Sequence, residues 1–271
     1  MDQTECNYHK RPVAPVEPPV WRAIAPLWHT LILLIGIILL SFAGASQLSG
    51  EHAEIDRLQT YAFTAGTELS MLAWVYFGLR LRKMPFRSLL GSVSGSFRSL
   101  AIDFGLALAF WIGALFVLAN LGIYWTLTEA AIKHRPLFPG KELAPDPSQQ
   151  QTIHTLAQLA PTDIREVVAW IFLCILAGIA EELVFRGYLQ RQFTAWARGA
   201  AVVGVIGSAL FFGAAHGYQG ARNMVLLAVF GVLFSLLALF RRSLRPGIFA
   251  HAWHDLIAGL VLAFLHTHHK L

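Results

Sequence analysis

The sequence predicts an all-α protein, a polytopic bundle of about seven transmembrane helices around an intramembrane polar cavity. Of the 271 residues, 56% are hydrophobic and only 14% are charged, and the mean hydropathy is +0.55. This composition is typical of polytopic membrane proteins and argues against a water-soluble fold. Because a spanning helix needs roughly 20 mostly apolar residues, we expect spans at about 25–46, 61–80, 99–124, 166–190, 199–217, 222–241 and 247–266.

Basic residues are divided unevenly between the two ends of this bundle. With the N-terminus inside, the internal segments hold about two thirds of the 21 Lys and Arg residues. Since short loops rich in Lys and Arg stay in the cytoplasm, we expect a cytoplasmic N-terminus and an external C-terminus in a multi-pass protein of the bacterial inner or plasma membrane. The net charge of +5 then reflects topology and contact with anionic membrane lipid, and no nucleic-acid partner is expected.

Composition shifts divide the chain into three regions. Residues 1–24 are rich in proline and read as an extended cytoplasmic tail. Residues 25–160 hold the N-terminal spans and a long external loop at about 126–163, where proline and polar residues leave room for a short helix at most. Residues 161–271 hold the remaining spans and the residues that carry chemistry.

The fourth predicted span carries Glu181, Glu182 and Arg186 within an otherwise apolar run. Charges in a lipid-buried helix are costly and therefore mark function by default. Residues four apart share a helix face, so Arg186 can neutralise Glu182, while Glu181 faces elsewhere without a cation. An unpaired buried carboxylate suits general acid–base catalysis. The alternative is a salt-bridged helix end that has slipped into lipid, which leaves Glu181 unexplained.

Two later spans also bring polar side chains into the membrane. His216 ends the fifth span, next to a ridge of small residues around Gly204 that allows close helix packing. Considered alone, His216 is more often an ordinary interfacial histidine than a functional one. In the seventh span the four-residue spacing places His251 and Asp255 on one face. Polar side chains well inside a span favour a functional role over a structural hydrogen bond.

Three ordered motifs on successive spans resemble those of the CPBP family, the CAAX-type intramembrane endopeptidases and their bacteriocin-processing relatives. The resemblance covers about residues 165–266, within a catalytic core expected at 161–271, and no motif matches residues 1–160. The motifs are weak one by one and specific as a set: Glu-Glu-x-x-x-Arg at 181–186, Phe-x-x-x-His at 212–216 and His-x-x-x-Asp at 251–255.

The resemblance implies a role for each residue of these motifs. Glu181 would be the base that activates water, and His216 would assist it. His251 would stabilise the oxyanion. Glu182 and Arg186 would brace the site as a structural pair.

Asp255 departs from the family pattern, because the best-described members carry Asn at the matching position. It would either be protonated, or orient His251 by accepting its ring N–H. Glu68 lies near the middle of the second span and is expected to line the same cavity or to pair with Arg186. Asp103 lies near a span end, where a solvated carboxylate is ordinary.

Depth creates a difficulty for this site. At a rise of 1.5 Å per residue, Glu181, His251 and Asp255 lie roughly 8 to 15 Å from the inner face, whereas His216 lies at about 25 Å. Helix tilt or a later start of the fifth helix would have to close this gap.

The motif residues allow either zinc-dependent or metal-independent activation of water. Glu181, His216 and His251 can together hold zinc with one position left for water, yet a Glu–His pair can activate water unaided. The helix-borne HExxH pattern is absent, and we expect metal-independent chemistry. Cys6 lies in the tail and Cys174 in a span, so neither a disulfide nor a CxxC metal site is indicated.

The leading function is an intramembrane endopeptidase that acts on a membrane-associated substrate, either a prenylated CAAX-like protein or a peptide precursor. A second hypothesis is a binding or immunity protein of the same family with little hydrolysis. A third is a proton-coupled transporter whose acids and histidines form a relay. Transporters usually show inverted repeats and broken helices, which we do not find in the sequence. A pure binding protein has no need of the unpaired Glu181.

Overall fold

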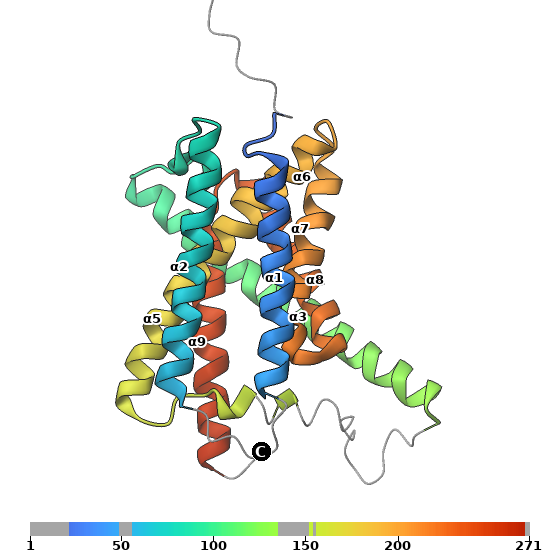
Figure 1. Ribbon diagram of the computed structural model, residues 1–271. Helices are drawn as coiled ribbons and strands as arrows, with labels where there is room; N and C mark the ends of the chain where they lie inside the picture. Colours follow the sequence, from blue (N-terminus) through green and yellow to red (C-terminus); the bar gives the residue numbers. More distant parts are fainter. Residues whose placement is uncertain (1–21, 49–55, 135–151, 154–155, 269–271) are drawn as a thin grey trace, which may run out of the picture.

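The computed structural model describes residues 22–48, 56–134, 152–153 and 156–268, and its regular structure is helical apart from one isolated bridge. Figure 1 shows the resulting helical bundle. Among the described residues, five helical stretches are long and apolar enough to cross a membrane: α1 (Leu27–Leu48), α3 (Phe97–Ile132), the continuous helix α5–η2–α6 (Ile164–Trp196), η3–α8 (Gly217–Arg241) and α9 (Arg245–Thr267). The predicted all-α polytopic bundle is confirmed.

The other two predicted spans are also helices, but each is atypical. Helix α2 (Arg57–Leu81) is 25 residues long and carries more polar side chains than its neighbours. Helix α7 (Ala201–Ala215) is strongly apolar but has only 15 residues. Both contribute to the candidate site described below.

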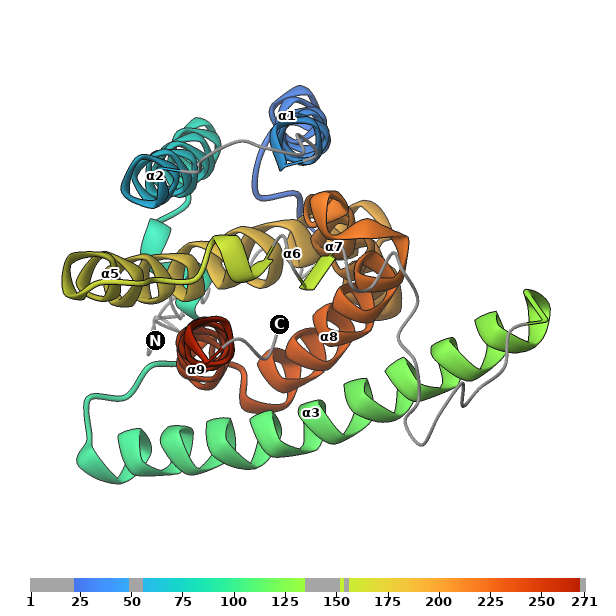
Figure 2. The same cartoon turned by 90° about the horizontal axis from the view of Figure 1, so that it is seen from below.

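The third and fourth helices extend beyond their predicted ends. Helix α3 was expected to stop near residue 124 and continues to Ile132, where Lys133 contacts Glu129 at 2.6 Å. The loop therefore does not begin at 126 as predicted, because hydropathy ends before helix-forming residues do. At 36 residues, α3 is about 54 Å long, well over the roughly 30 Å of hydrocarbon, and Figure 2 shows it running obliquely across the bundle.

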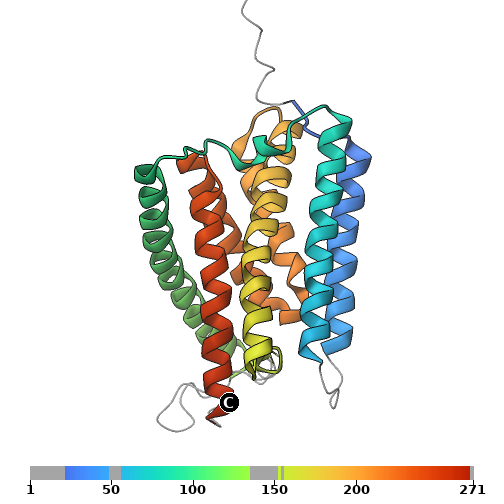
Figure 3. The same ribbon diagram turned by 90° about the vertical axis from the view of Figure 1, so that its left-hand side faces the viewer.

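The helices form layers when the bundle is viewed along its long axis. Figure 2 shows α1 and α2 as a pair on one side, α5, α6 and α7 in the middle, α8 and α9 next, and α3 on the far side. Figure 3 shows the same order from the side, with α3 and the α1–α2 pair at opposite edges. The helices that carry the predicted motifs therefore lie inside the bundle.

The loops predicted to be cytoplasmic meet at one end of the bundle. Gly91 forms an antiparallel bridge with Ser243, and the Ser92 N–H donates to the Arg242 carbonyl at 2.7 Å. Gly91 has a φ of +73°, and a Cβ there would lie 2.3 Å from the Arg242 oxygen. Glycine is thus required both by the backbone conformation and by the close approach.

Asp103 is not the solvated carboxylate that its position near a span end predicted. Its side chain is fully buried, and it accepts hydrogen bonds from Arg241, at 2.6 Å, and from Arg245. The two arginines lie about 140 residues further along the chain, at the junction of α8 and α9. No local sequence pattern joins such partners, so this clamp between α3, α8 and α9 was missed.

Buried polar contacts attach the first two helices to the fourth. The His29 ring on α1 stacks on Trp74 of α2 at 4.7 Å, and its Nε2 contacts the Trp74 carbonyl at 2.8 Å. Because a carbonyl only accepts, Nε2 carries the proton, and Nδ1 accepts from the Tyr188 hydroxyl at 2.9 Å. Gly78 leaves the space for this ring, since a Cβ there would lie 2.3 Å from it.

Candidate active site

The helix that carries the glutamate pair changes geometry where the pair lies. Helix α5 (Ile164–Glu181) is followed by the π-helix η2 (Glu182–Leu189), and α-helical geometry resumes in α6 (Gln190–Trp196). The hydroxyl of Ser208, on α7, donates to the Phe185 carbonyl of this segment at 2.6 Å. π-Helical turns are rare and occur often at functional sites. Nothing in the sequence analysis predicted this segment.

The predicted pair of Glu182 and Arg186 is present within the π-helix. Arg186 Nη1 lies 3.0 Å from Glu182 Oε1, and both side chains are fully buried. The guanidinium also lies over the rings of Phe212, at 4.2 Å, and Phe234, at 4.9 Å. These contacts compensate a charge pair that would otherwise be costly to bury.

His251 connects this pair to the second glutamate. Its Nδ1 lies 3.2 Å from Glu182 Oε1, and its Nε2 lies 3.6 Å from Glu181 Oε2 and 3.8 Å from Asp255 Oδ2. A carboxylate paired with Arg186 only accepts, so Nδ1 carries the proton and Nε2 faces Glu181. The acceptor that orients the ring is therefore Glu182. Asp255, on which the sequence analysis placed this role as one alternative, lies beyond hydrogen-bond distance.

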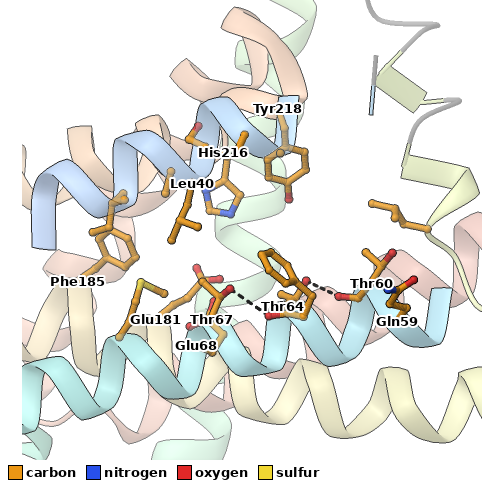
Figure 4. A pocket seen from close by; sticks show the side chains of 18 of the residues that line it. Leu40, Gln59, Thr60, Thr64, Thr67, Glu68, Glu181, Phe185, His216 and Tyr218 are labelled. Atoms are coloured by element: carbon orange, nitrogen blue, oxygen red, sulfur yellow. Dashed lines mark hydrogen bonds between the residues drawn. The ribbon is translucent and has the colours of Figure 1, made fainter. Parts of the chain in front are cut away.

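His216 is also held in one tautomer. Its Nδ1 lies 2.8 Å from the Phe212 carbonyl one turn earlier, and because a carbonyl only accepts, Nδ1 donates its proton there. The unprotonated Nε2 is left to act as an acceptor. Figure 4 shows the His216 ring pointing into a cavity toward Glu181 and Glu68.

The difficulty over depth disappears with the observed helix ends. The fourth span continues to Trp196 rather than ending near residue 190, so Glu181 lies 15 residues before its end. His216 lies 15 residues after Ala201, the first residue of α7. At 1.5 Å per residue, both lie about 22 Å from the same end of the bundle. The predicted span end near residue 190 had placed Glu181 closer to this end of the bundle than His216.

The cavity has a volume of about 570 Å³ and lies between the α1–α2 pair and the helices that carry the motifs. Glu68, Glu181 and His216 all line it. Glu68 is only 6% exposed. Of the two possibilities for Glu68, the shared cavity is the one observed, since Arg186 is paired with Glu182. His251 and Asp255 are not among the residues lining the cavity and reach it through Glu181.

Several cavity residues were not singled out by the sequence analysis. Thr60 and Thr67 line it from α2, and Tyr218 lines it just beyond His216. The signal for the α2 residues was present, because polar side chains at positions 60, 64 and 68 recur at helical spacing on one face. Tyr218 carried no comparable signal.

The proposed zinc ligands do not form a metal site. Among the residues that the structure describes, no group of three His, Cys, Asp or Glu side chains is arranged to hold a metal ion. Glu181, His216 and His251 therefore do not fit as a ligand set.

Comparison with known proteins agrees with the motifs. Residues 163–269 match the family model for type II CAAX prenyl endopeptidase Rce1-like proteins. Over this range the chain is similar to the type II CAAX prenyl endopeptidases. The match starts at Asp163, the N-cap of α5, and contains all three motifs, so the expected resemblance is confirmed. The family is one of intramembrane proteases, which supports a peptidase embedded in the membrane. No curated protein and no solved structure matches the chain.

Proposed function

We propose that this Rce1-like protein is an intramembrane endopeptidase in which Glu181 and His216 activate water to hydrolyse a peptide bond of a membrane-associated substrate. The observation that carries the proposal is that these two side chains, from α5 and from the end of α7, line one cavity at the same depth. A peptide bond that reaches this depth belongs to a substrate held in or at the membrane. Prenylated CAAX-like proteins and peptide precursors both meet this condition.

The first chemical step needs a base beside the attacking water. Glu181 lines the cavity and, among the described residues, forms no ion pair with a Lys or Arg, so its carboxylate is available to take a proton from water. The His216 Nε2 lone pair accepts the other water proton as a hydrogen bond, which orients the oxygen toward the scissile carbonyl carbon. The new C–O bond moves an electron pair onto the carbonyl oxygen.

Collapse of the tetrahedral intermediate completes the reaction. The C–N bond breaks, and the proton held by Glu181 passes to the amine that leaves. The products are a carboxylic acid and an amine, which become a carboxylate and an ammonium ion by proton transfer, so the atoms of one water are consumed. His251 does not line the cavity but contacts Glu181, with its Nε2 3.6 Å from Glu181 Oε2. Because its Nδ1 already donates to Glu182, Nε2 donates to an oxyanion only in the imidazolium form.

Replacement of Glu181 tests this function. Comparing membrane proteomes of cells that carry the wild-type protein or Glu181→Gln identifies the native substrate as the species that accumulates. With that substrate and purified protein, we expect Glu181→Gln to fold normally and to lose at least about two orders of magnitude in turnover. Glu166→Gln, the same change at the start of α5, serves as the control with unchanged turnover. Wild-type turnover by Glu181→Gln would refute the assignment.

A further inference from the structure

The walls of the cavity are acidic. Asp56, Glu68 and Glu181 line it, and no Lys or Arg is present among the described residues that do so. Among the lining residues that the structure describes, His216 is the one basic group. The nearest buried guanidinium, on Arg186, is engaged by Glu182, and His251 already faces three carboxylates.

Glu68 is the carboxylate that the structure leaves without compensation. It is 94% buried, and its Oε2 has no hydrogen-bond partner among the described residues. The hydroxyls beside it cannot supply one, because Thr64 donates to the Thr60 carbonyl and Thr67 to the Phe63 carbonyl. A buried carboxylate without a partner is costly, and an incoming cation would remove that cost.

The cavity also suits the stem of a long basic side chain. Leu40, Met71 and Phe185 give it apolar walls close to Glu68, and Figure 4 shows Leu40 and Phe185 facing the carboxylates across the cavity. Lys and Arg side chains bury their methylene stems against apolar surface while the charged end meets a polar group. A negatively charged group in the same place would instead face the carboxylates of Glu68 and Glu181.

We propose that this cavity selects substrates by a lysine or arginine side chain, which Glu68 contacts as a specificity residue. The inference rests on the proposed function and names the substrate class of that same site. A substrate segment with a basic residue near the scissile bond is bound, and one that presents a carboxylate at that position is rejected. Glu68 lies outside residues 163–269, so the selectivity belongs to the N-terminal helices of this chain.

Binding of matched peptides tests the proposal independently of turnover. The probes are short myristoylated fluorescent peptides that differ only in one central residue, Lys, Gln or Glu. Binding is measured to the full-length Glu181→Gln protein in zwitterionic lipid nanodiscs, because this variant does not cleave the peptides. Empty nanodiscs give the correction for partitioning of the peptides into lipid. We expect the Lys peptide to bind at least about tenfold more tightly than the Glu peptide. Adding Glu68→Gln should remove most of this difference and leave the affinity for the Gln peptide unchanged.

Glu166→Gln in the same background is the matched control and should keep the preference for Lys. Equal affinities for the Lys and Glu peptides, or a preference that survives Glu68→Gln, would overturn the proposal while leaving the peptidase function intact. Displacement of the Lys peptide by Ca²⁺ only when Glu68 is present would show that the cavity holds a free cation, and would also overturn it. Wild-type turnover by Glu181→Gln would instead refute the peptidase function.

Discussion

The Arg186 guanidinium is buried between one carboxylate and two aromatic rings. It lies 3.0 Å from Glu182 and over the rings of Phe212 and Phe234. Glu182 in turn accepts from His251 at 3.2 Å. Arg186 therefore acts on the site through Glu182, because it keeps in place the acceptor that fixes the His251 tautomer.

Removal of this guanidinium should destabilise the protein. Arg186→Ala leaves Glu182 buried without a cation, and breaking such a pair costs on the order of 3 to 5 kcal/mol. We expect a clear fall in the melting temperature of the purified protein in detergent. Arg186→Lys keeps the charge but loses the planar contact with the rings. Its melting temperature should lie between those of the wild-type protein and Arg186→Ala. A melting temperature unaffected by Arg186→Ala would show that the pair contributes nothing to stability.

The distances around His251 separate the roles of its two acidic neighbours. Glu182 holds the ring through Nδ1, whereas Asp255 lies 3.8 Å from Nε2. We therefore expect Glu182→Gln to reduce turnover about 10-fold to 100-fold, as for partners that orient a catalytic ring. Asp255→Asn should cost less than about tenfold, since Asp255 neither holds the ring by a hydrogen bond nor lines the cavity. Turnover of the two variants, measured on folded protein, gives the comparison. A larger loss for Asp255→Asn would reverse the assignment of the orienting acceptor.

At the scale of the elements, the placement of His216 depends on how closely α7 packs against α8. Gly213 lies three residues before it, and a Cβ at Gly213 would lie 2.3 Å from the Met224 carbonyl oxygen. That oxygen belongs to the backbone of α8 (Gly220–Arg241) and cannot rotate away. Any side chain at Gly213 must therefore move one helix against the other.

A pair of alanine substitutions tests this packing. Gly213→Ala should lower the unfolding free energy by about 1 to 3 kcal/mol, the usual cost of overpacking, and should reduce turnover by displacing His216. Gly113→Ala, on α3, is the control, because a Cβ there meets nothing within 4 Å. It should be neutral or stabilising by roughly 0.5 to 1 kcal/mol. Equal effects on thermal melting would contradict the role of the α7–α8 contact.

At the scale of the whole molecule, the two ends of the bundle differ in charge, which predicts the orientation in the membrane. Loops at one end meet around Gly91 and Ser243, and Val93 is exposed there. In a Cys6→Ser background, we expect an impermeant thiol reagent to label Arg165→Cys in intact cells and Val93→Cys only after permeabilisation. The opposite pattern would invert the topology.

Sequence reasoning reached the parts of this protein that depend on local spacing. The pair of Glu182 and Arg186 follows from a separation of four residues, and apolar runs of about 20 residues locate the helices. The sequence did not predict the π-helix η2 (Glu182–Leu189), because its residue types do not distinguish a π-helix from an α-helix. Nor did it reach the buried state of Asp103, whose partners are brought close by the fold alone.

The cavity shows the same division. Three motif residues were expected to meet, but only Glu181 and His216 line the space, while His251 stands behind them. Which face of α2 closes that space depends on how the α1–α2 pair docks, through His29, Trp74 and Tyr188. These docking contacts join residues 45 positions apart, His29 and Trp74, and 159 positions apart, His29 and Tyr188, and hydropathy carries no trace of them.

Synthesis brings α2 into the membrane long before the helices that shield Glu68 exist. In the chain, Glu181 and His216 follow Glu68 by more than a hundred residues. At that stage α2 presents a carboxylate and a row of hydroxyls that lipid cannot solvate. The translocon releases a segment into lipid according to its apolarity, so we expect α2 to wait at the protein-lined exit beside α1 until α5 emerges. The polar face that α2 turns to the cavity thus predicts an order of assembly for the helices of this protein.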